Sequence, residues 1–466
     1  MHLIPMRLQR IAPSRAASGL GARICNFGMY TAGFLAVVNI SIMYLVLRQV
    51  ETHLHARVAD QQWILSIYPL MEGGFTLALG VLGDSYGCKR VLGAATWLFI
   101  IATLACAVAP TAGMLIVGRG VQGIAGAALL SLPLAILIDL QPDPSNNLRI
   151  VQLFATVAAI AAGLAPLIGG ALVTWFGWPS VFYFSAVLAL VVLAALWFAP
   201  DTSSHRVTRF DVRGQVTAIL ACLAISYALI EGNARGYGSP QIVAAFCLAA
   251  AAAALFLLVE RRTQYPMVNL RYFRVAAFDA SLLVAAIVNF GWYGLMLLTT
   301  FYLQHASHLR EIAVGAYLMP CNVAYFIANL YSARLARRSG MPVLLIAGFA
   351  VSVLGMAWML LLAQQSPPWH IAAALGISGF GWGVISTPAT SLGMSAVRSS
   401  DEGFASGTLA LSRSLSGVFG IAVLGALSLH LAAAVCILLT FVFATAGAGM
   451  LRASGRLIYC THEDDR

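Results

Sequence analysis

The chain has 466 residues, of which 60% are hydrophobic and 9% are charged. Because about a quarter of the residues in an average soluble protein are charged, this composition excludes an ordinary soluble protein and leaves no room for a soluble catalytic domain. The net charge is +10, but the basic residues fall between apolar segments and do not form one solvated basic face, so we expect no nucleic-acid partner.

The apolar segments predict an all-α integral membrane protein with about 14 transmembrane helices. A helix needs roughly 20 apolar residues to cross the hydrocarbon core of a bilayer. Windows of this kind cover residues 25–47, 62–83, 90–109, 113–139, 149–174, 179–199, 213–232, 240–259, 277–303, 311–333, 341–363, 370–395, 403–427 and 429–451. Only short loops remain between them.

The windows divide into two six-helix bundles with an inserted pair of helices between them. The predicted divisions are a cytoplasmic N-terminus at 1–24, a first bundle at 25–199, a linker with helices seven and eight at 200–276, a second bundle at 277–451 and a cytoplasmic tail at 452–466. A weak internal repeat supports this division, because the segment Gly80–Gly87 after the second window is echoed by Ala333–Gly340 after the tenth. Repeats are typical of secondary transporters, which bind substrate at the repeat interface.

The distribution of lysine and arginine predicts the orientation of the chain, because cytoplasmic loops carry the excess of these residues. With a cytoplasmic N-terminus, four of the 27 basic residues lie in outer loops, two lie within windows and the remaining 21 lie inside. We therefore expect a multi-pass protein of the bacterial cytoplasmic (inner) membrane with both termini cytoplasmic.

Three ionisable residues lie deep within the predicted helices, where such residues are costly and are functional candidates by default. Glu72 and Arg413 lie midway along their windows, and Arg119 lies in the outer part of its window. Burial favours the neutral form of a carboxylate and a nearby arginine favours the ionised form, so Glu72 with Arg119 predicts a site that binds and releases a proton. In the alternative interpretation, Glu72 and Arg119 form a fixed structural pair and Arg413 joins two helices through backbone carbonyls.

Polar residues at helical spacing predict the lining of a substrate cavity. Polar stripes facing lipid would lack hydrogen-bond partners, so they are expected to face protein or a water-filled cavity. The candidate lining residues are Gln122, Asn322, Tyr325, Asn329, Trp382, Ser386 and Arg413. Hydrogen bonding between helices without any substrate contact is the alternative.

Motifs of soluble enzymes are missing from the sequence. It contains no phosphate-binding loop, no HExxH and no GxSxG, and the dinucleotide-like letters at Gly118–Gly123 lie inside an apolar window with no preceding strand. We therefore expect no enzymatic activity, no metal site and no bound cofactor. Uphill transport would be driven by an ion gradient or by the membrane potential.

Several spaced motifs resemble those of the major facilitator superfamily. The segment Gly80–Leu92 resembles the loop signature between helices two and three, with Ser85 and Cys88 where basic residues are usual. Residues 119–123 are similar to the RxxQG element of helix four, and residues 163–170 are similar to the antiporter motif of drug exporters, with Ala165 in place of a glycine. The 14 windows and the motifs near Gln62, Phe210 and Pro266 resemble the 14-helix drug:proton antiporters.

This resemblance implies an exporter of small, mostly apolar or drug-like compounds that exchanges them for protons by alternating access. It implies the proton gradient as the energy source, with a small-molecule substrate and membrane lipids as partners, and it leaves a periplasmic adaptor unassigned. A transporter of one specific metabolite with the same fold is the alternative. A receptor without transport activity is disfavoured by the loop signature and the antiporter-like segment.

One departure from the subfamily changes the expected proton site. The antiporters of this subfamily usually carry an aspartate in helix one, and Phe34 occupies that position here. Glu72 is therefore the candidate proton-coupling acid, with Arg119 as the group that tunes it. With one central acid and two arginines, we expect neutral, zwitterionic or weakly anionic aromatic substrates to be preferred over multiply charged cations.

The resemblance also assigns a conformational latch and a seal. The latch consists of Gly80, Asp84, Gly87, Lys89 and Arg90. Its carboxylate and its basic pair are suited to joining the ends of neighbouring helices on one side of the transport cycle. The antiporter motif consists of Gly163, Pro166, Gly169 and Gly170. Its small residues permit close helix approach, either for packing alone or to seal the cavity.

Overall fold

The computed structural model describes residues 19–140, 146–200, 211–263, 270–307, 309–361, 367–398, 402–428 and 431–440. Within these ranges the chain is almost entirely helical and contains no strand, which confirms the predicted all-α class. Most of the N-terminal segment 1–24, the tail 452–466 and residues 441–451 of the last window lie outside the described residues, as do the motif residues Phe210 and Pro266.

The first part of the chain forms the helices that cover the first six windows. They are α1 (Leu20–Ser41), the short helix η2 (Ile42–Val46), α2 (Leu47–Leu54), α3 (Val58–Tyr86), α4 (Cys88–Ala107), α5 (Ala112–Asp139), α6 (Asn147–Phe176) and α7 (Ser180–Leu196). The first window therefore continues through η2 and α2 and ends later than predicted. The inserted pair is α8 (Val212–Arg235) and α9 (Pro240–Arg262).

The last part of the chain repeats this helical pattern. It contains η4 (Leu270–Arg274), α10 (Ala276–Phe301), η5 (Tyr302–Ala306), α11 (Glu311–Ser339), α12 (Met341–Leu360), α13 (Pro368–Ser395) and α14 (Glu402–Leu424). A further short apolar helix, Leu431–Thr440, lies in the described part of the fourteenth window. Twelve helices among the described residues are long and apolar enough to cross a membrane, as a multi-pass membrane protein requires.

The two echoed segments end in the same backbone geometry. Gly87 separates α3 from α4 with φ of 95°, and Gly340 separates α11 from α12 with φ of 80°. Residues with a Cβ rarely adopt such positive φ values, so glycine allows the chain to reverse within a single residue at both junctions. The repeat seen in the sequence therefore corresponds to two equivalent turns.

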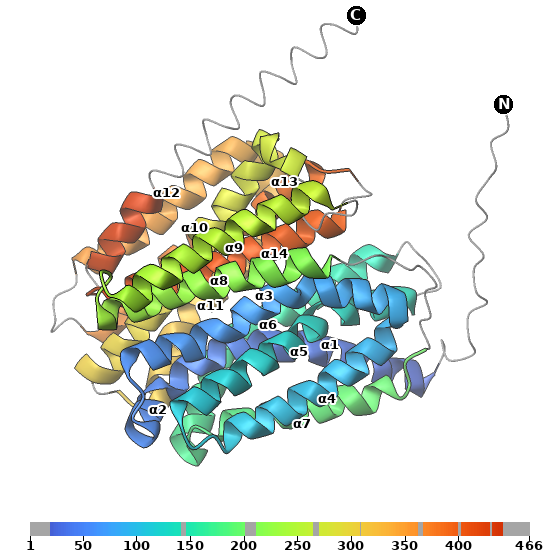
Figure 1. Ribbon diagram of the computed structural model, residues 1–466, viewed down its shortest axis with the longest axis horizontal. Helices are drawn as coiled ribbons and strands as arrows, with labels where there is room; N and C mark the ends of the chain where they lie inside the picture. The colour runs from blue at the N-terminus through green and yellow to red at the C-terminus, as the bar shows by residue number, and fades with distance from the viewer. Residues whose placement is uncertain are drawn as a thin grey trace, which may run out of the picture.

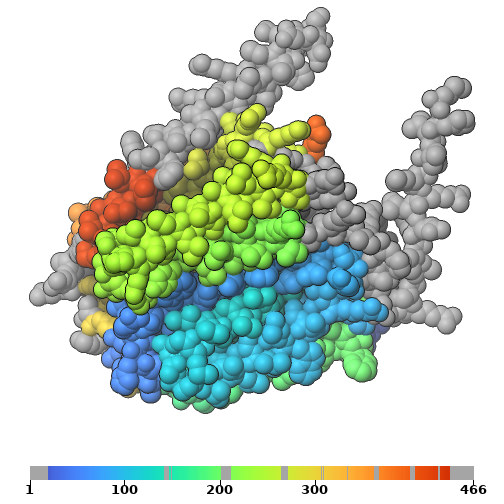
Figure 2. Space-filling model, viewed as in Figure 1, coloured from blue at the N-terminus to red at the C-terminus, as the bar shows by residue number. Residues whose placement is uncertain are grey.

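The early and late helices meet along two pairs of helices (Figure 1). α6 packs against α11 and α3 packs against α14, whereas most other extensive contacts join helices of the same part, such as α3 with α5 and α11 with α13. α8 packs on both α3 and α14, and α9 packs on α8. Figure 2 shows α8 and α9 as a continuous green to yellow-green band beside the blue residues of α3.

The helical assembly has two ends, which are named here by the residues that they carry. The α2 end carries α2 and the connections α6–α7 and α10–α11, and the Gly87 end carries the turns at Gly87 and Gly340. Near the α2 end, α6 and α11 are joined by close contacts. Toward the Gly87 end, the same two helices are mostly exposed, including Leu153 on α6 and Tyr331 on α11. α6 and α11 are therefore held together most tightly at the α2 end.

Candidate functional site

Arg119 on α5 lies in a fully buried hydrogen-bond network. Its Nη1 donates to Gln122 Oε1 at 2.6 Å and to Asn39 Oδ1 at 3.3 Å. Its Nη2 donates to the Asn39 carbonyl at 3.3 Å, and its Nε donates to the Ile64 carbonyl at 3.4 Å. Because a buried guanidinium is costly unless its donors are used, these bonds are what allow Arg119 to lie inside the assembly.

The network continues beyond the partners of Arg119. Gln122 Nε2 donates to Thr103 Oγ1 at 2.8 Å, and Asn39 Nδ2 donates to Ser185 Oγ at 3.1 Å. Side chains and carbonyls from α1, α3, α4, α5 and α7 thus share one set of bonds. A network this extensively bonded holds its members in fixed positions.

Tyr68 connects Arg119 to Glu72. The guanidinium carbon of Arg119 lies 4.4 Å from the centroid of the Tyr68 ring, and the Tyr68 hydroxyl donates to Glu72 Oε1 at 3.3 Å. Glu72 is 5% exposed and forms no ion pair with Arg119 among the described contacts. The fixed structural pair that the sequence left open is therefore not formed in this conformation, and an aromatic ring separates the two groups.

Two glycines on α5 position Tyr68 for this role. A Cβ at Gly123 would lie 2.4 Å from the Tyr68 carbonyl oxygen, and a Cβ at Gly126 would lie 2.3 Å from the Tyr68 hydroxyl. Both distances are shorter than real Cβ contacts, so α3 and α5 can approach this closely only because glycine occupies both positions. The glycine of the RxxQG element therefore packs against a tyrosine. Gly118 lies within α5 and packs against Cys106, which agrees with a helical and not a nucleotide-binding role.

A cavity of about 180 Å³ lies between the early and late helices. It is lined by residues of α1, α6, α10 and α11, among them Ser41, Asn289, Trp292, Tyr293 and Asn322. Its wall combines aromatic rings with amide and hydroxyl groups and contains no carboxylate or basic side chain. Such a wall is suited to an uncharged compound with aromatic surface and hydrogen-bonding groups.

The predicted lining residues divide into three groups in the structure. Asn322 and Tyr325 line the cavity, as expected. Gln122 does not, because it bonds to Arg119 and Thr103. Trp382 is 1% exposed and packs so closely against α10 that a Cβ at Gly291 would lie 2.8 Å from its ring. The expectation that Gln122 and Trp382 line the cavity therefore does not hold in this conformation.

The remaining predicted lining residues join neighbouring helices of the late part. The Tyr325 hydroxyl on α11 donates to Ser386 Oγ on α13 at 2.7 Å. Thr387 donates to Asn329, which forms a second link between the same helices. Arg413 on α14 donates to the Thr390 hydroxyl on α13.

These three contacts are hydrogen bonds between helices. For Asn329, Ser386 and Arg413 they match the alternative interpretation of the sequence, in which these residues join helices. Arg413 therefore joins two helices, but through a side-chain hydroxyl and not through the backbone carbonyls considered from the sequence. All three residues remain half-buried.

The antiporter-like segment of α6 packs against α11. A Cβ at Gly170 would lie 2.5 Å from the Glu311 carbonyl oxygen, and a Cβ at Gly315 would lie 2.2 Å from the Pro166 carbonyl oxygen. Gly169 faces Ile42 at a similarly short distance, whereas the nearest atom to a Cβ at Gly163 is 3.7 Å away. Gly169, Gly170 and Pro166 thus lie where α6 closely approaches η2 and α11, whereas no such approach requires a glycine at position 163.

Polar contacts reinforce this approach at the α2 end. Gln49 Nε2 donates to Glu311 Oε1 at 3.4 Å, and Gln49 Oε1 accepts from the Trp178 backbone at 2.8 Å. The backbone of Ile312 donates to Thr174 Oγ1 at 3.1 Å. The bonds of Gln49 to Glu311 and of Ile312 to Thr174 connect the early and late parts, so the cavity is closed toward the α2 end by packing and by hydrogen bonds.

The latch residues are not joined to one another in this structure. Asp84 is exposed and forms no ion pair with a described residue, and Arg90 is also exposed. Lys89 Nζ donates to the Ala199 carbonyl at 2.6 Å, which connects the start of α4 to the end of α7. This arrangement agrees with a latch that is made on the opposite side of the transport cycle.

The glycines of the latch differ in what they do. Gly87 forms the turn between α3 and α4, while a Cβ at Gly80 would meet no atom within 4 Å. Gly83, which sequence reasoning did not select, faces Leu132 so closely that a Cβ there would lie 2.6 Å from that side chain.

Sequence reasoning also missed Asn39, Thr103 and Ser185 as site residues. Asn39 carries a usable signal, because an amide in an otherwise apolar window needs a buried partner. Thr103 and Ser185 are indistinguishable from the many hydroxyl side chains that bond to their own helix. Their partners depend on how the helices are rotated against each other, which no local pattern records.

Known proteins resemble this chain over most of its length. The Major Facilitator Superfamily model matches residues 29–421. The multidrug resistance protein Stp of Mycobacterium tuberculosis is 30% identical over 393 residues, which cover 84% of this chain and 73% of that protein. The methylenomycin A resistance protein of Streptomyces coelicolor is 29% identical over 395 residues, which cover 85% of this chain and 83% of that protein.

A solved structure confirms the fold at lower identity. The crystal structure of the peptide transporter POT in complex with sulfate matches with a TM-score of 0.69 and 16% identity, and the match covers 93% of this chain and 94% of that chain. At this identity the likeness concerns the fold alone.

Proposed function

The chain belongs to the Major Facilitator Superfamily, and we propose that it exports small, mostly apolar or drug-like compounds in exchange for protons. Relatives named for multidrug resistance and for methylenomycin A resistance support export, and the cavity between the two parts of the chain supports alternating access. The protein is thus a multi-pass membrane transporter, and the proposal concerns what it carries and what drives it.

The observation that supports proton coupling is the burial of Glu72 without a cationic partner in the described part of the chain. Transferring an ionised carboxylate out of water is costly unless it is paired, so a bound proton on Glu72 stabilises the conformation described here. Hydration of Glu72, or direct pairing with Arg119, would favour the ionised form after the helices rearrange. A group whose proton affinity changes with conformation is what an exchanger needs.

Sealing of the α2 end supports alternation of the cavity between the two sides of the membrane. In this conformation α6 and α11 meet at Gly170 and Gly315, and the latch residue Asp84 forms no ion pair with a residue that the structure describes. Opening the α2 end would separate these helices, and closing the Gly87 end would bring the latch residues into contact with neighbouring helices. The antiporter-like segment therefore acts as a seal in addition to its role in packing.

The energy source in this proposal is the proton gradient, without a bound cofactor. One charge moved across 100 mV corresponds to about 2.3 kcal/mol, or roughly a fiftyfold concentration ratio. Small-molecule substrates and membrane lipids are the proposed partners, and no adaptor protein is assigned.

We extend the proposal to orientation, with both termini cytoplasmic and the α2 end facing outward. The 21 basic residues assigned to inner segments, against four in outer loops, support this orientation. Reporter fusions at the C-terminus test it. A periplasmic C-terminus would overturn both the orientation and the count of 14 spans.

A substrate screen in inverted vesicles tests the function directly. We expect inside-acid vesicles containing the protein to accumulate neutral aromatic compounds, and we expect a dication such as methyl viologen to be excluded. Accumulation of one metabolite class alone would favour the specific-metabolite alternative. Accumulation of the dication with no transport of neutral aromatics would contradict the proposed substrate preference, and no flux of any compound would contradict export.

A further inference from the structure

Tyr293 on α10 lies at the boundary between the cavity and the helix that carries Glu72. Tyr293 is one of the residues that line the cavity, and it is 8% exposed. The neighbouring ring of Trp292 packs edge-on at a centroid distance of 4.8 Å. The ring also packs against α14, because a Cβ at Gly417 would lie 2.9 Å from it.

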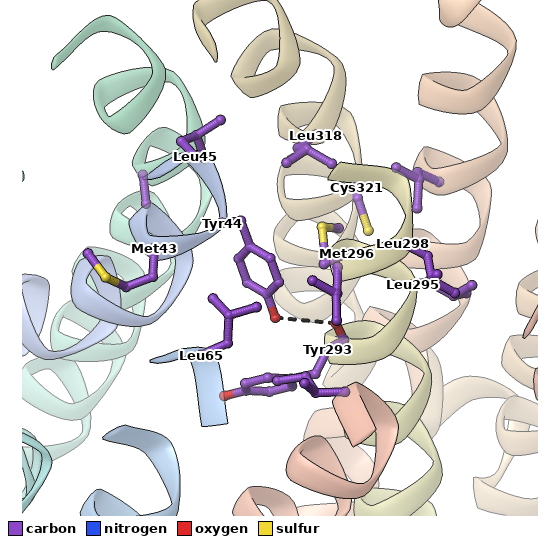
Figure 3. Packing of buried hydrophobic residues seen from close by; sticks show 14 of the residues in the cluster. Met43, Tyr44, Leu45, Leu65, Tyr293, Leu295, Met296, Leu298, Leu318 and Cys321 are labelled. Carbon is purple, nitrogen blue, oxygen red and sulfur yellow. Dashed lines mark hydrogen bonds between the residues drawn. The ribbon is translucent and has the colours of Figure 1, made fainter. Parts of the chain in front are cut away.

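The backbone at this position is held across the two parts of the chain. The hydroxyl of Tyr44, in η2, donates to the Tyr293 carbonyl at 3.3 Å. Figure 3 shows this bond as a dashed line and shows the Tyr293 ring extending from α10 toward the segment that carries Leu65, on α3. The ring therefore crosses from the late part of the chain toward the early part at the level of the cavity.

The Tyr293 hydroxyl is available for a new contact. It forms no hydrogen bond with any residue that the structure describes. Five titratable or charged groups lie within electrostatic range of it: Tyr44 in η2, Glu72 and Tyr68 on α3, Tyr325 on α11 and Arg413 on α14. All of them except Glu72 already donate a hydrogen bond, to the Tyr293 carbonyl, Glu72, Ser386 and Thr390 respectively.

Glu72 also has capacity for a further bond. One carboxyl oxygen accepts from Tyr68, and Arg119 lies behind the ring of that tyrosine. The other oxygen forms no hydrogen bond with a described residue, and Glu72 keeps a small exposed fraction of 5%. The Tyr293 ring extends toward Leu65, which lies on the same face of α3 as Glu72 and two turns before it, so the two groups lie on the same side of α3.

We propose that the Tyr293 hydroxyl couples substrate binding to the proton on Glu72, and that the preferred substrates are uncharged aromatic compounds carrying a hydrogen-bond donor. Protonated Glu72 donates to the Tyr293 oxygen. A substrate N–H or O–H group that binds the same oxygen displaces Glu72 and turns the hydroxyl proton toward the carboxyl group. Because the ionised carboxylate accepts this bond better than the acid does, the proton leaves Glu72 for water at the exposed edge of its side chain.

This coupling has the sign that exchange requires. Substrate and the Glu72 proton compete for one oxygen atom, so binding of one favours release of the other. The inference rests on the proposed function and adds to it a coupling residue and a feature of the substrate. Because the donor-bearing substrate binds the form with ionised Glu72, its affinity rises as pH rises.

A matched pair of probes tests the proposal with the purified full-length protein in nanodiscs. N-phenyl-1-naphthylamine carries one N–H donor, and its N-methyl derivative carries none. For the wild type, we expect proton release into a weakly buffered solution on binding of the first probe and none on binding of the second. The affinity for the donor probe should exceed that for the methylated probe by about tenfold, as expected for one hydrogen bond.

Tyr293→Phe keeps the ring and the backbone carbonyl and removes only the hydroxyl. We expect this variant to bind the two probes within about threefold of each other and to release no proton, whereas Tyr331→Phe, at an exposed position on α11, should behave as the wild type does. Unchanged proton release in Tyr293→Phe would overturn the coupling role. Equal affinity of the wild type for both probes, or failure to bind either, would overturn the substrate feature.

Two further results keep the test decisive. If Tyr293→Phe does not fold, the pH dependence of the wild type still decides, because only the donor probe should bind more tightly as pH rises. Transport of other neutral compounds by wild-type vesicles under a pH gradient reports on the proposed function separately. Gradient-driven export together with identical behaviour of wild type and Tyr293→Phe would refute this inference and leave the exchanger intact.

Discussion

The early helices hold charge in a fixed, fully bonded network, whereas the late helices line the cavity with half-buried polar groups. Arg119 is completely buried and its contacts span α1, α3 and α5. Arg413, its counterpart in the late part, is half-buried and bonds to one hydroxyl on α13. In the proposed mechanism, the early part holds the proton-binding group and the late part contributes most of the polar contacts to the substrate.

The comparison also explains why an arginine and a glutamate can lie close together without pairing. Tyr68 separates them, with its ring against Arg119 and its hydroxyl on Glu72. A direct pair would hold the carboxylate ionised in every conformation. The intervening ring leaves the proton affinity of Glu72 dependent on hydration, and therefore on the position of the helices.

The largest effect should come from removing Arg119. Arg119→Ala leaves the side chains of Asn39 and Gln122 short of partners in a buried site, so we expect the free energy of unfolding to fall by about 2 kcal/mol or more. Transport should fall at least tenfold. Thermal unfolding in detergent and flux in vesicles measure the two effects.

Arg413→Ala is the matched control for that prediction. It removes a half-buried side chain with one hydroxyl partner, so its effect on the free energy of unfolding should stay below about 1 kcal/mol. Equal destabilisation by the two substitutions would break the distinction between a fixed early part and an adaptable late part.

The seal between α6 and α11 should respond more moderately. Gly170→Ala places a methyl group against the backbone of Glu311, and overpacking of this kind costs about 1–3 kcal/mol. We expect the conformation closed at the α2 end to lose population and transport to slow. Distances between spin labels at positions 53 and 310 report on closure.

Gly163→Ala on the same helix provides the control, because its nearest neighbour is 3.7 Å away. Its transport rate should stay within about twofold of wild type, since a methyl group fits there at ordinary contact distance. If both alanine variants impair closure equally, the segment acts through general helix packing and not through a local seal.

The smallest effect on binding should come from the latch. Asp84 is exposed and remote from the cavity, so Asp84→Asn should leave substrate affinity within about threefold while slowing turnover, because a contact of the opposite conformation is lost. Equilibrium binding and initial transport rates separate the two quantities. A large loss of affinity with normal turnover would show that Asp84 does not act as a latch.

The membrane fold could be predicted because hydrophobicity and glycine turns are local properties of the sequence. The rarity of charge in the apolar windows likewise selected Glu72 and Arg119 correctly as buried groups. The role of Tyr68 could not be predicted, since its position between the two charges depends on Gly123 and Gly126 of another helix. Helical spacing identified the polar stripe of Asn322, Tyr325 and Asn329 on α11. It could not determine that Tyr325 and Asn329 bond to side chains of α13.

Accumulation by a Glu72 variant tests the central claim most directly. In vesicles with an imposed pH gradient, the wild type should concentrate a transported neutral aromatic compound, and Glu72→Gln should allow only downhill exchange because its side chain carries no exchangeable proton. Tyr331→Phe serves as the control for expression and insertion. Glu72→Gln vesicles that still concentrate the compound, with unchanged pH dependence, would contradict the account and place the coupling group elsewhere.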